Sequence, residues 1–211
     1  MLGKRASVGS EASAGASWHR RGITAAVATG ALAFAGLGAA ACSSSPAAST
    51  TTQAATATTA APAPQNVAMQ LNTSGPGHSD WPQFVPGDFT VNKGAQVTLT
   101  ITNHDDGTAP LTSALSQYDN VQGGTETVDG TAVTSEPNAN VAHTFTVPEL
   151  GVNVVIPAAP TGGTNTIVFT FTPSKAGTFT WNCYAPCGSG SDGMGGAMVT
   201  DGWMTGKVTV A

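Results

Sequence analysis

Positive charge is scarce in this chain of 211 residues, which holds only seven lysines and arginines. Four of them lie in the first 21 residues, and from residue 42 onward three lysines face eleven acidic residues, a net charge of −8. A surface of that sign repels the phosphate backbone of nucleic acids, so we expect no nucleic-acid partner. It suits a basic protein partner, or it serves solubility alone.

Cysteine is equally scarce. The sequence has three cysteines, Cys42, Cys183 and Cys187, so at most one disulfide can form within a chain. Motifs for acid–base or nucleophilic chemistry are missing as well, because no general base, activated nucleophile or substrate pocket can be identified along the sequence. We therefore expect no independent hydrolytic or transferase activity.

The first 41 residues have the pattern of an export signal. Basic residues up to Arg21 precede an uncharged run, 22–41, which ends in three alanines before Cys42. Small residues before a cysteine resemble a lipoprotein processing site. This pattern predicts a lipid on Cys42 that anchors an extracytoplasmic protein to the cell membrane, on its outer face or in the periplasm.

After its first residue, Cys42, the segment 42–65 contains only Ser, Thr, Ala, Pro and Gln. Such a composition cannot bury enough apolar surface to offset the entropy of the chain, so we expect a disordered tether. The remaining residues, 66–211, are expected to form one domain.

Short apolar runs rich in Val, Thr, Ile and Phe alternate in this domain with clusters of Gly, Pro and Asn. No segment shows sustained helical periodicity, which predicts an all-β fold with few or no helices. We expect strands at 89–92, 96–102, 142–147, 166–172, 177–182 and 207–210. The interval 104–140, rich in Gly, Thr and Asp, is interpreted as an inserted hairpin or loop.

Soft metal ligands concentrate in the stretch 181–194, WNCYAPCGSGSDGM. Cys183 and Cys187 are four residues apart, and Met194 follows seven residues later. Upstream, His143 precedes a strand-like apolar run. One imidazole and three sulfurs are therefore available as metal ligands, a set that suits copper. A disulfide is the alternative, since positions four apart in a loop can meet its geometry.

Three segments resemble the cupredoxin family. VAHTFTVPELGVNVVIP and GTFTWNCYAPCG resemble the histidine-bearing strand and the cysteine loop of the soluble copper-binding domain of cytochrome c oxidase subunit II. FVPGDFTVNKGAQVTLTITN resembles the start of cupredoxin domains, so the resemblance extends from about Phe84 to the C-terminus. It implies a Greek-key β-sandwich with a metal at one end.

The resemblance also implies a ligand set: His143, Cys183, Cys187, Met194 and, as in the dinuclear CuA centre of that family, the backbone carbonyl of Ala185. The family centre has a histidine four residues after the second cysteine, where this chain has Ser191. Because the second copper then lacks its only nitrogen ligand, we expect one copper per chain. Met198 is a substitute thioether, and His104 is a weaker candidate for a replacement nitrogen ligand.

Three functions are compatible with these residues. The first is a membrane-tethered electron carrier with a thiolate-bound copper, whose redox partner is a c-type cytochrome or a membrane oxidase. The second is a copper chaperone or storage lipoprotein, because two cysteines at this spacing with one histidine also occur in copper delivery. The third is a metal-free binding module in which Cys183 and Cys187 form a disulfide.

Overall fold

The computed structural model describes residues 60–211. The predicted export signal, Cys42 and the tether up to residue 59 lie outside the described residues. The first strand begins at Gln65, the last residue that was assigned to the tether. Within residues 60–211, no helix has both the length and the apolar character that a membrane span requires.

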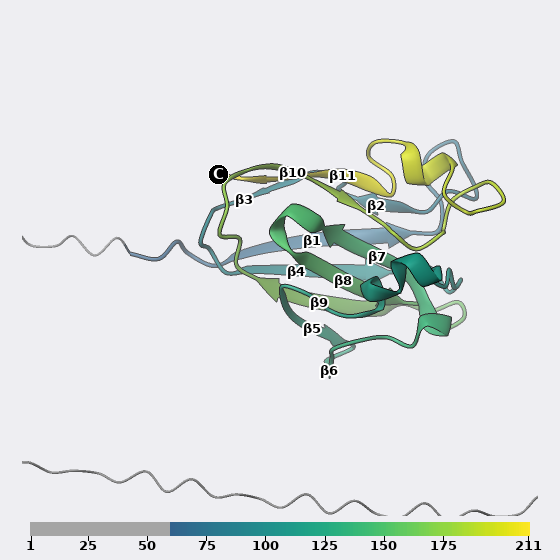
Figure 1. Cartoon of the computed structure of the whole chain (residues 1–211), viewed down its shortest axis with the longest axis horizontal. Helices are drawn as coiled ribbons and strands as arrows, with labels where there is room; N and C mark the ends of the chain where they lie inside the picture. Colours follow the sequence, from purple (N-terminus) through teal and green to yellow (C-terminus); the bar gives the residue numbers. More distant parts are fainter. Residues whose placement is uncertain (1–59) are drawn as a thin grey trace, which may run out of the picture. The chain divides into compact units, whose positions relative to one another are not determined.

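Two β-sheets make up the described part of the chain (Figure 1). In spatial order, the six-stranded sheet contains β2 (Gln83–Val85), β1 (Gln65–Asn72), β4 (Val97–Asn103), β9 (Asn165–Phe171), β5 (Gly124–Val128) and β6 (Thr131–Val133). The five-stranded sheet contains β3 (Phe89–Val91), β11 (Thr205–Val210), β10 (Gly177–Asn182), β7 (Val141–Val147) and β8 (Val152–Pro157).

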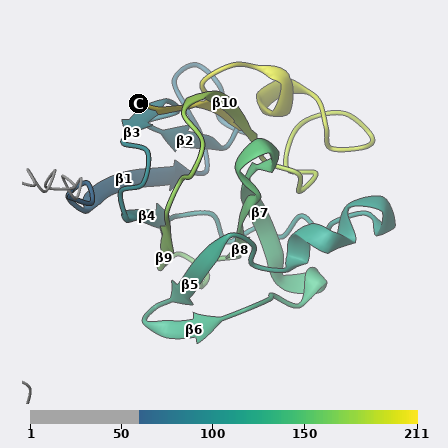
Figure 2. The same ribbon diagram turned by 60° about the vertical axis from the view of Figure 1, so that its left-hand side comes forward.

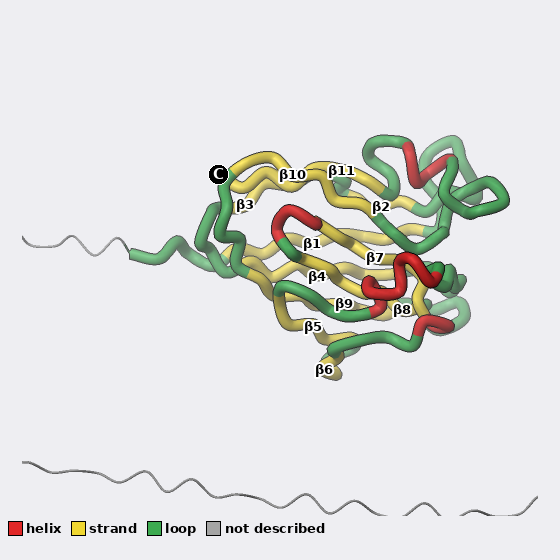
Figure 3. Tube along the Cα trace, in the orientation of Figure 1, coloured by secondary structure: helices red, strands yellow, loops and turns green. Residues whose placement is uncertain are grey.

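The expected all-β, Greek-key sandwich is confirmed. Consecutive strands repeatedly change sheet, as in Greek-key sandwiches, and each sheet combines antiparallel pairs with one parallel pair, β1 with β4 and β3 with β11. Helical structure in the described residues is limited to short 3₁₀ turns, which Figure 3 shows in red beside the strands. The interval 104–140 contains two such turns, η1 (Ser113–Asp119) and η2 (Asn138–Asn140), and the antiparallel hairpin β5–β6, so the expected hairpin is present.

The core lies between the two sheets and follows the alternation of the strands. Every second residue of β4 and of β9 is buried, as expected for strands with one face against a core. In the five-stranded sheet, β7 and β8 are buried along their whole length. Trp181 lies against Phe84 and Phe145 in this core, with ring centroids 5.1 and 5.0 Å away, and provides a rigid base for the loop that follows β10.

The loop after β10 lies at the end of the sandwich opposite the C-terminus, where Figure 1 shows it in yellow. Figure 2 shows from a second side that the hairpin β5–β6 lies away from this loop. The loop after β10 and the hairpin β5–β6 are therefore separate regions of the domain.

Candidate metal centre

One imidazole and two thiols converge at the end of the sandwich. His143 comes from β7, while Cys183 and Cys187 come from the loop that follows β10, and the possible ligand atoms of the three residues lie within 4.8 Å of one another. The Cys183 Sγ lies 3.5 Å from the Cys187 Sγ and 4.0 Å from the His143 Nδ1. Both cysteines are free thiols. The sequence-predicted residues His143, Cys183 and Cys187 are thus brought together.

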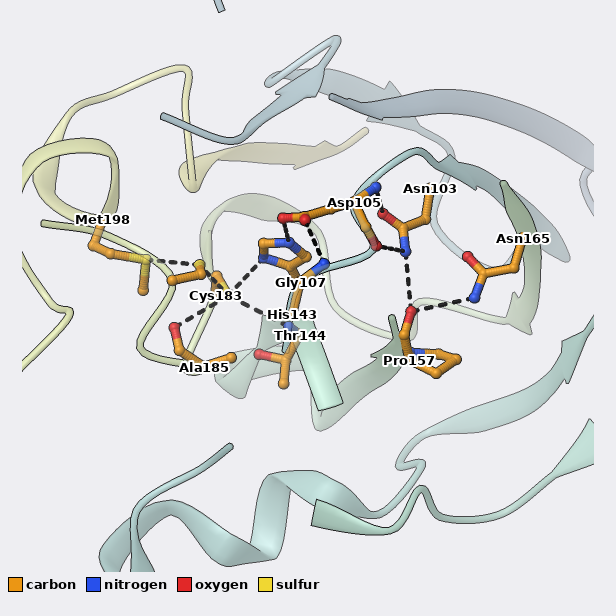
Figure 4. A network of polar contacts seen from close by, with 11 residues as sticks. Asn103, Asp105, Gly107, His143, Thr144, Pro157, Asn165, Cys183, Ala185 and Met198 are labelled. Carbon is orange, nitrogen blue, oxygen red and sulfur yellow. Dashed lines mark hydrogen bonds and ion pairs between the residues drawn. The ribbon is translucent and has the colours of Figure 1, made fainter. Parts of the chain in front are cut away.

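Asp105 fixes the orientation of the His143 ring. The Nε2–H of the buried imidazole donates a hydrogen bond of 2.9 Å to the Asp105 Oδ2, which leaves Nδ1 facing the Cys183 sulfur (Figure 4). The other oxygen, Oδ1, accepts a hydrogen bond from the backbone N–H of Gly107. A histidine that binds a metal through one nitrogen commonly donates its other N–H to a carboxylate in this way. Sequence analysis did not identify Asp105 as part of the site.

Buried amides hold the Asp105 segment in place. Asn103, at the end of β4, accepts a hydrogen bond from the Asp105 N–H and donates to the Pro157 carbonyl, which also accepts from Asn165. Figure 4 shows this chain of contacts leading from Asn165 to the imidazole. Because these contacts join β4, β8 and β9, the carboxylate that orients His143 is positioned by the body of the sandwich.

Thr144 positions the first cysteine from the other side. Its backbone N–H lies 3.4 Å from the Cys183 Sγ, in position to donate to the sulfur, and its hydroxyl oxygen accepts a hydrogen bond from the Tyr184 N–H. The Cys183 N–H in turn donates to the Met204 carbonyl. The thiol of Cys183 is 2% exposed, so water does not compete for these contacts.

The charges of the cluster depend on one another. Burial alone would lower the pKa of His143, but the carboxylate of Asp105 and the sulfur of Cys183 outweigh it and raise that pKa to about 9. Burial likewise opposes ionisation of Cys183, but hydrogen bonds with Cys187 and His143 lower the pKa of its thiol. The hydrogen bond with Cys183, together with burial, raises the pKa of Cys187. The cluster therefore favours a Cys183 thiolate beside an imidazolium, and a cation that displaces the shared protons finds its ligands close together.

A thioether that contacts a cysteine sulfur belongs to Met198. Its Sδ accepts a hydrogen bond of 3.2 Å from the Cys187 thiol, and the residue is 8% exposed. The glycine-rich stretch folds back on itself through hydrogen bonds between Gly188 and Gly193 and between Ser189 and Gly195, and this turn directs η4 (Gly196–Val199) over the cysteines. The side chain of Met194 is partly buried, but among residues 60–211 no hydrogen bond joins its sulfur to the cluster. The substitute thioether, Met198, is thus the one for which a sulfur–sulfur hydrogen bond is observed in the described residues.

The remaining sequence-predicted candidates differ in position. The Ala185 carbonyl lies 3.6 Å from the Cys183 Sγ and accepts a hydrogen bond from the Cys187 N–H. His104 is exposed, and its ring pairs with the Gln70 side chain. Ser191 is exposed at the tip of the glycine-rich turn. The carbonyl is therefore beside the cluster, whereas neither His104 nor Ser191 contacts it.

A cavity of about 350 Å³ adjoins the cluster and makes it reachable from outside. His143 and Cys187 line it together with Asp80, Asp105, Pro186 and Gly188. Cys187 is partly exposed, unlike Cys183. Two carboxylates at this cavity favour the approach of a cation.

The donor separations fit one soft metal ion. With metal–sulfur bonds of about 2.3 Å and metal–nitrogen bonds of about 2.0 Å, a tetrahedral ion holds two sulfurs roughly 3.8 Å apart and a sulfur and a nitrogen roughly 3.6 Å apart. The observed distances of 3.5 and 4.0 Å differ from these by a few tenths of an ångström. Thiolate, thioether and imidazole ligands favour copper, and a thiolate pair with imidazole also suits zinc.

No family model and no curated protein matches the chain. Among solved structures, reduced rusticyanin is 19% identical with a TM-score of 0.35, and the match covers 69% of this chain and 79% of that chain. Rusticyanin from Thiobacillus ferrooxidans is 18% identical with a TM-score of 0.33, covering 69% and 77%. A multi-copper oxidase from Pediococcus acidilactici is 11% identical with a TM-score of 0.34, covering 72% of this chain but 26% of that one. The fold and the site described above rest on the chain's own strand pairing and contacts.

Proposed function

We propose that this chain is an extracytoplasmic copper-binding electron carrier that a lipid on Cys42 tethers to the membrane. The observation that carries the proposal is the convergence of the His143 Nδ1 and two cysteine sulfurs within 4.8 Å at a cavity. Met198 adds a thioether to this set. Copper bound by such ligands supplies one-electron exchange.

The surroundings of the ligands favour fast electron transfer, because they restrict ligand motion. Asp105 holds the buried imidazole ring and is itself held by Asn103 at the end of β4, and Thr144 of β7 holds the Cys183 sulfur. A site that cannot rearrange presents nearly the same ligand geometry to both oxidation states. The buried core beneath the site, with Trp181 at 0% exposure, also excludes water from that side.

The proposal includes one copper per chain. The dinuclear centre of cytochrome c oxidase subunit II needs a second nitrogen ligand, and Ser191 stands at its position. Neither Ser191 nor His104 contacts the donor cluster. One metal with His143, the two cysteines and a thioether accounts for all the soft ligands in contact.

A basic redox partner suits the charge of the chain. Residues 60–211 contain three lysines and eleven acidic residues, and two of the acids, Asp80 and Asp105, line the cavity at the donor cluster. Such a field attracts a protein with a basic docking face, such as a c-type cytochrome or a membrane oxidase. The rate of electron exchange should then fall as ionic strength rises.

The experiment that tests the proposal compares three cysteine-to-serine variants of the full chain. Cys183→Ser and Cys187→Ser should each abolish the visible thiolate-to-copper absorption and greatly reduce the copper content. Cys42→Ser is the matched control, because it should leave the copper spectrum intact while releasing the protein from membranes. Unchanged copper content in the first two variants would refute the site, and a wild-type protein released without a lipid would refute the tether.

Copper delivery is a second candidate, favoured by the partial exposure of Cys187 at the cavity. A sulfur that a partner can reach is what ligand exchange between two proteins requires. Voltammetry separates the two functions. A reversible couple in the copper-loaded protein supports the carrier, whereas tight Cu(I) binding with rapid transfer to an acceptor and no reversible couple supports delivery.

A further inference from the structure

A second cavity lies at the inserted hairpin, away from the cysteines. Its volume is about 210 Å³, and its lining surface is mostly apolar, with Val121, Ala132 and Val133 among the residues that line it. At roughly 30 Å³ for each water molecule in the liquid, this volume corresponds to about seven waters. The cavity is therefore of a size for a small organic molecule, below the usual range for larger ligands.

Glu126 is the one ionisable residue that lines this cavity. It belongs to β5 and is 2% exposed. Its Oε2 accepts a hydrogen bond of 3.2 Å from the backbone N–H of Val155, in the other sheet, but its Oε1 has no hydrogen-bond partner among the described residues. Within residues 60–211 the only ion pair joins His143 to Asp105, so no lysine or histidine there balances the charge of Glu126.

A buried carboxyl group without a donor is unfavourable for the fold. Buried polar groups are nearly always hydrogen-bonded, and an unmatched one destabilises the fold, more so when it is charged. Burial raises the pKa of Glu126 to about 8, against the opposing effect of the Val155 N–H. A cation bound beside such a group lowers its pKa, because it stabilises the carboxylate that burial destabilises, and the proton of Glu126 then passes to the solvent.

We propose that this cavity binds a small aliphatic ammonium compound. The ammonium group donates to the free Oε1 of Glu126, and a short branched alkyl chain lies against Val121 and Val133. A cation is favoured over a neutral donor because its hydrogen bond to a carboxylate is charge-assisted. The excess of acidic residues over lysines favours the same sign of ligand. The proposal is independent of copper, since none of its residues belongs to the donor cluster.

The test is a titration of the full chain at about neutral pH with isobutylammonium, followed by the amide NMR signals of Thr125, Glu126 and Val133. Isobutanol and isobutyrate serve as neutral and anionic probes of nearly the same shape. We expect isobutylammonium to shift these signals saturably and to bind about tenfold or more tightly than either analogue. Equal binding of the alcohol, or no saturable shift with any probe, would overturn the proposal.

Two variants localise the binding. Glu126→Gln keeps the shape of the side chain but removes the charge, and it should weaken isobutylammonium binding about tenfold. Glu136→Gln is the matched control, because it makes the same change at a nearby glutamate that does not line the cavity, and it should change the affinity less than about twofold. Unchanged affinity in Glu126→Gln, with its fold verified by the amide spectrum, would also overturn the proposal. The three-probe comparison on the unaltered protein stands whether or not a variant folds.

Discussion

Replacing Asp105 by Asn tests how far the strength of the metal site depends on the group that orients its histidine. The Asp105 carboxylate accepts from the His143 Nε2–H through Oδ2 and from the Gly107 N–H through Oδ1. An asparagine has the same shape but only one acceptor atom. One of the two N–H groups must then face an amide NH₂, and the negative charge beside the imidazole is lost.

The expected loss of copper affinity is about 10- to 100-fold, the usual effect of removing the partner of a metal-bound histidine. Its size should depend on pH. The pKa of His143 is raised to about 9 by Asp105 and Cys183, so near neutral pH a proton competes with copper for Nδ1 in the unaltered protein. Loss of the carboxylate lowers that pKa and weakens this competition, which offsets part of the loss. At about pH 10 the proton no longer competes, and the full loss should appear.

Competition titrations with a chromophoric Cu(I) chelator measure this affinity at both pH values. Asp106→Asn is the matched control, because it makes the same change one residue away, at an exposed carboxylate that accepts from the Gly162 N–H and does not contact the imidazole. We expect its affinity to equal that of the unaltered protein. If Asp105→Asn bound copper as tightly as this control at the higher pH, the assignment of His143 as an oriented ligand would be wrong.

Three further predictions concern the thioether, the metal count and the buried glutamate. Met198→Leu should shift the midpoint potential of the copper site more than Met194→Leu does, since the Met198 sulfur lies 3.2 Å from that of Cys187; voltammetry giving equal shifts would contradict this. Ser191→His should leave about one copper per chain by metal analysis, because position 191 is exposed at the tip of a turn, and a second copper would mean that the turn opens. Burial raises the folded-state pKa of Glu126 from 4.5 to about 8, so between these pH values the native state retains a proton that the unfolded state releases. The free energy of unfolding should therefore fall as pH rises through this window, by up to about 1.4 kcal/mol per pH unit. Chemical denaturation should show a weaker fall in Glu126→Gln, and an equal slope in both proteins would contradict the buried-carboxyl account.

Local sequence pattern was sufficient for the strands that alternate strongly. The six predicted strands occur within two residues of their expected ends, because Val, Ile, Phe and Thr at every second position dictate which face meets the core. β1 was missed, since QNVAMQLN begins with polar residues and its outer positions are exposed. Its formation depends on parallel pairing with β4, a contact between distant segments that no local pattern reveals.

The same distinction applies to the site. His143, Cys183 and Cys187 could be identified because each lies within or beside a short motif on a strand or its adjoining loop. Strand alternation also contains a signal for the residues near β4: Asn103 is buried, so His104 points the other way, and Asp105 is the next residue able to turn inward.

The thioether could not be ranked from sequence. Met194 and Met198 both follow the cysteines, and which of them reaches the cluster depends on how the glycine-rich turn closes. Glycine permits many turn conformations, so its presence predicts a turn without fixing the direction of the chain beyond it.

Metal analysis of the purified full chain, combined with mapping of free thiols, decides whether the cysteine cluster binds copper. We expect about one copper per chain, with Cys183 and Cys187 both protected from a thiol reagent while copper is bound and both reactive after a chelator removes it. A chain that retains no copper and yields a peptide in which Cys183 is joined to Cys187 by a disulfide would contradict this expectation.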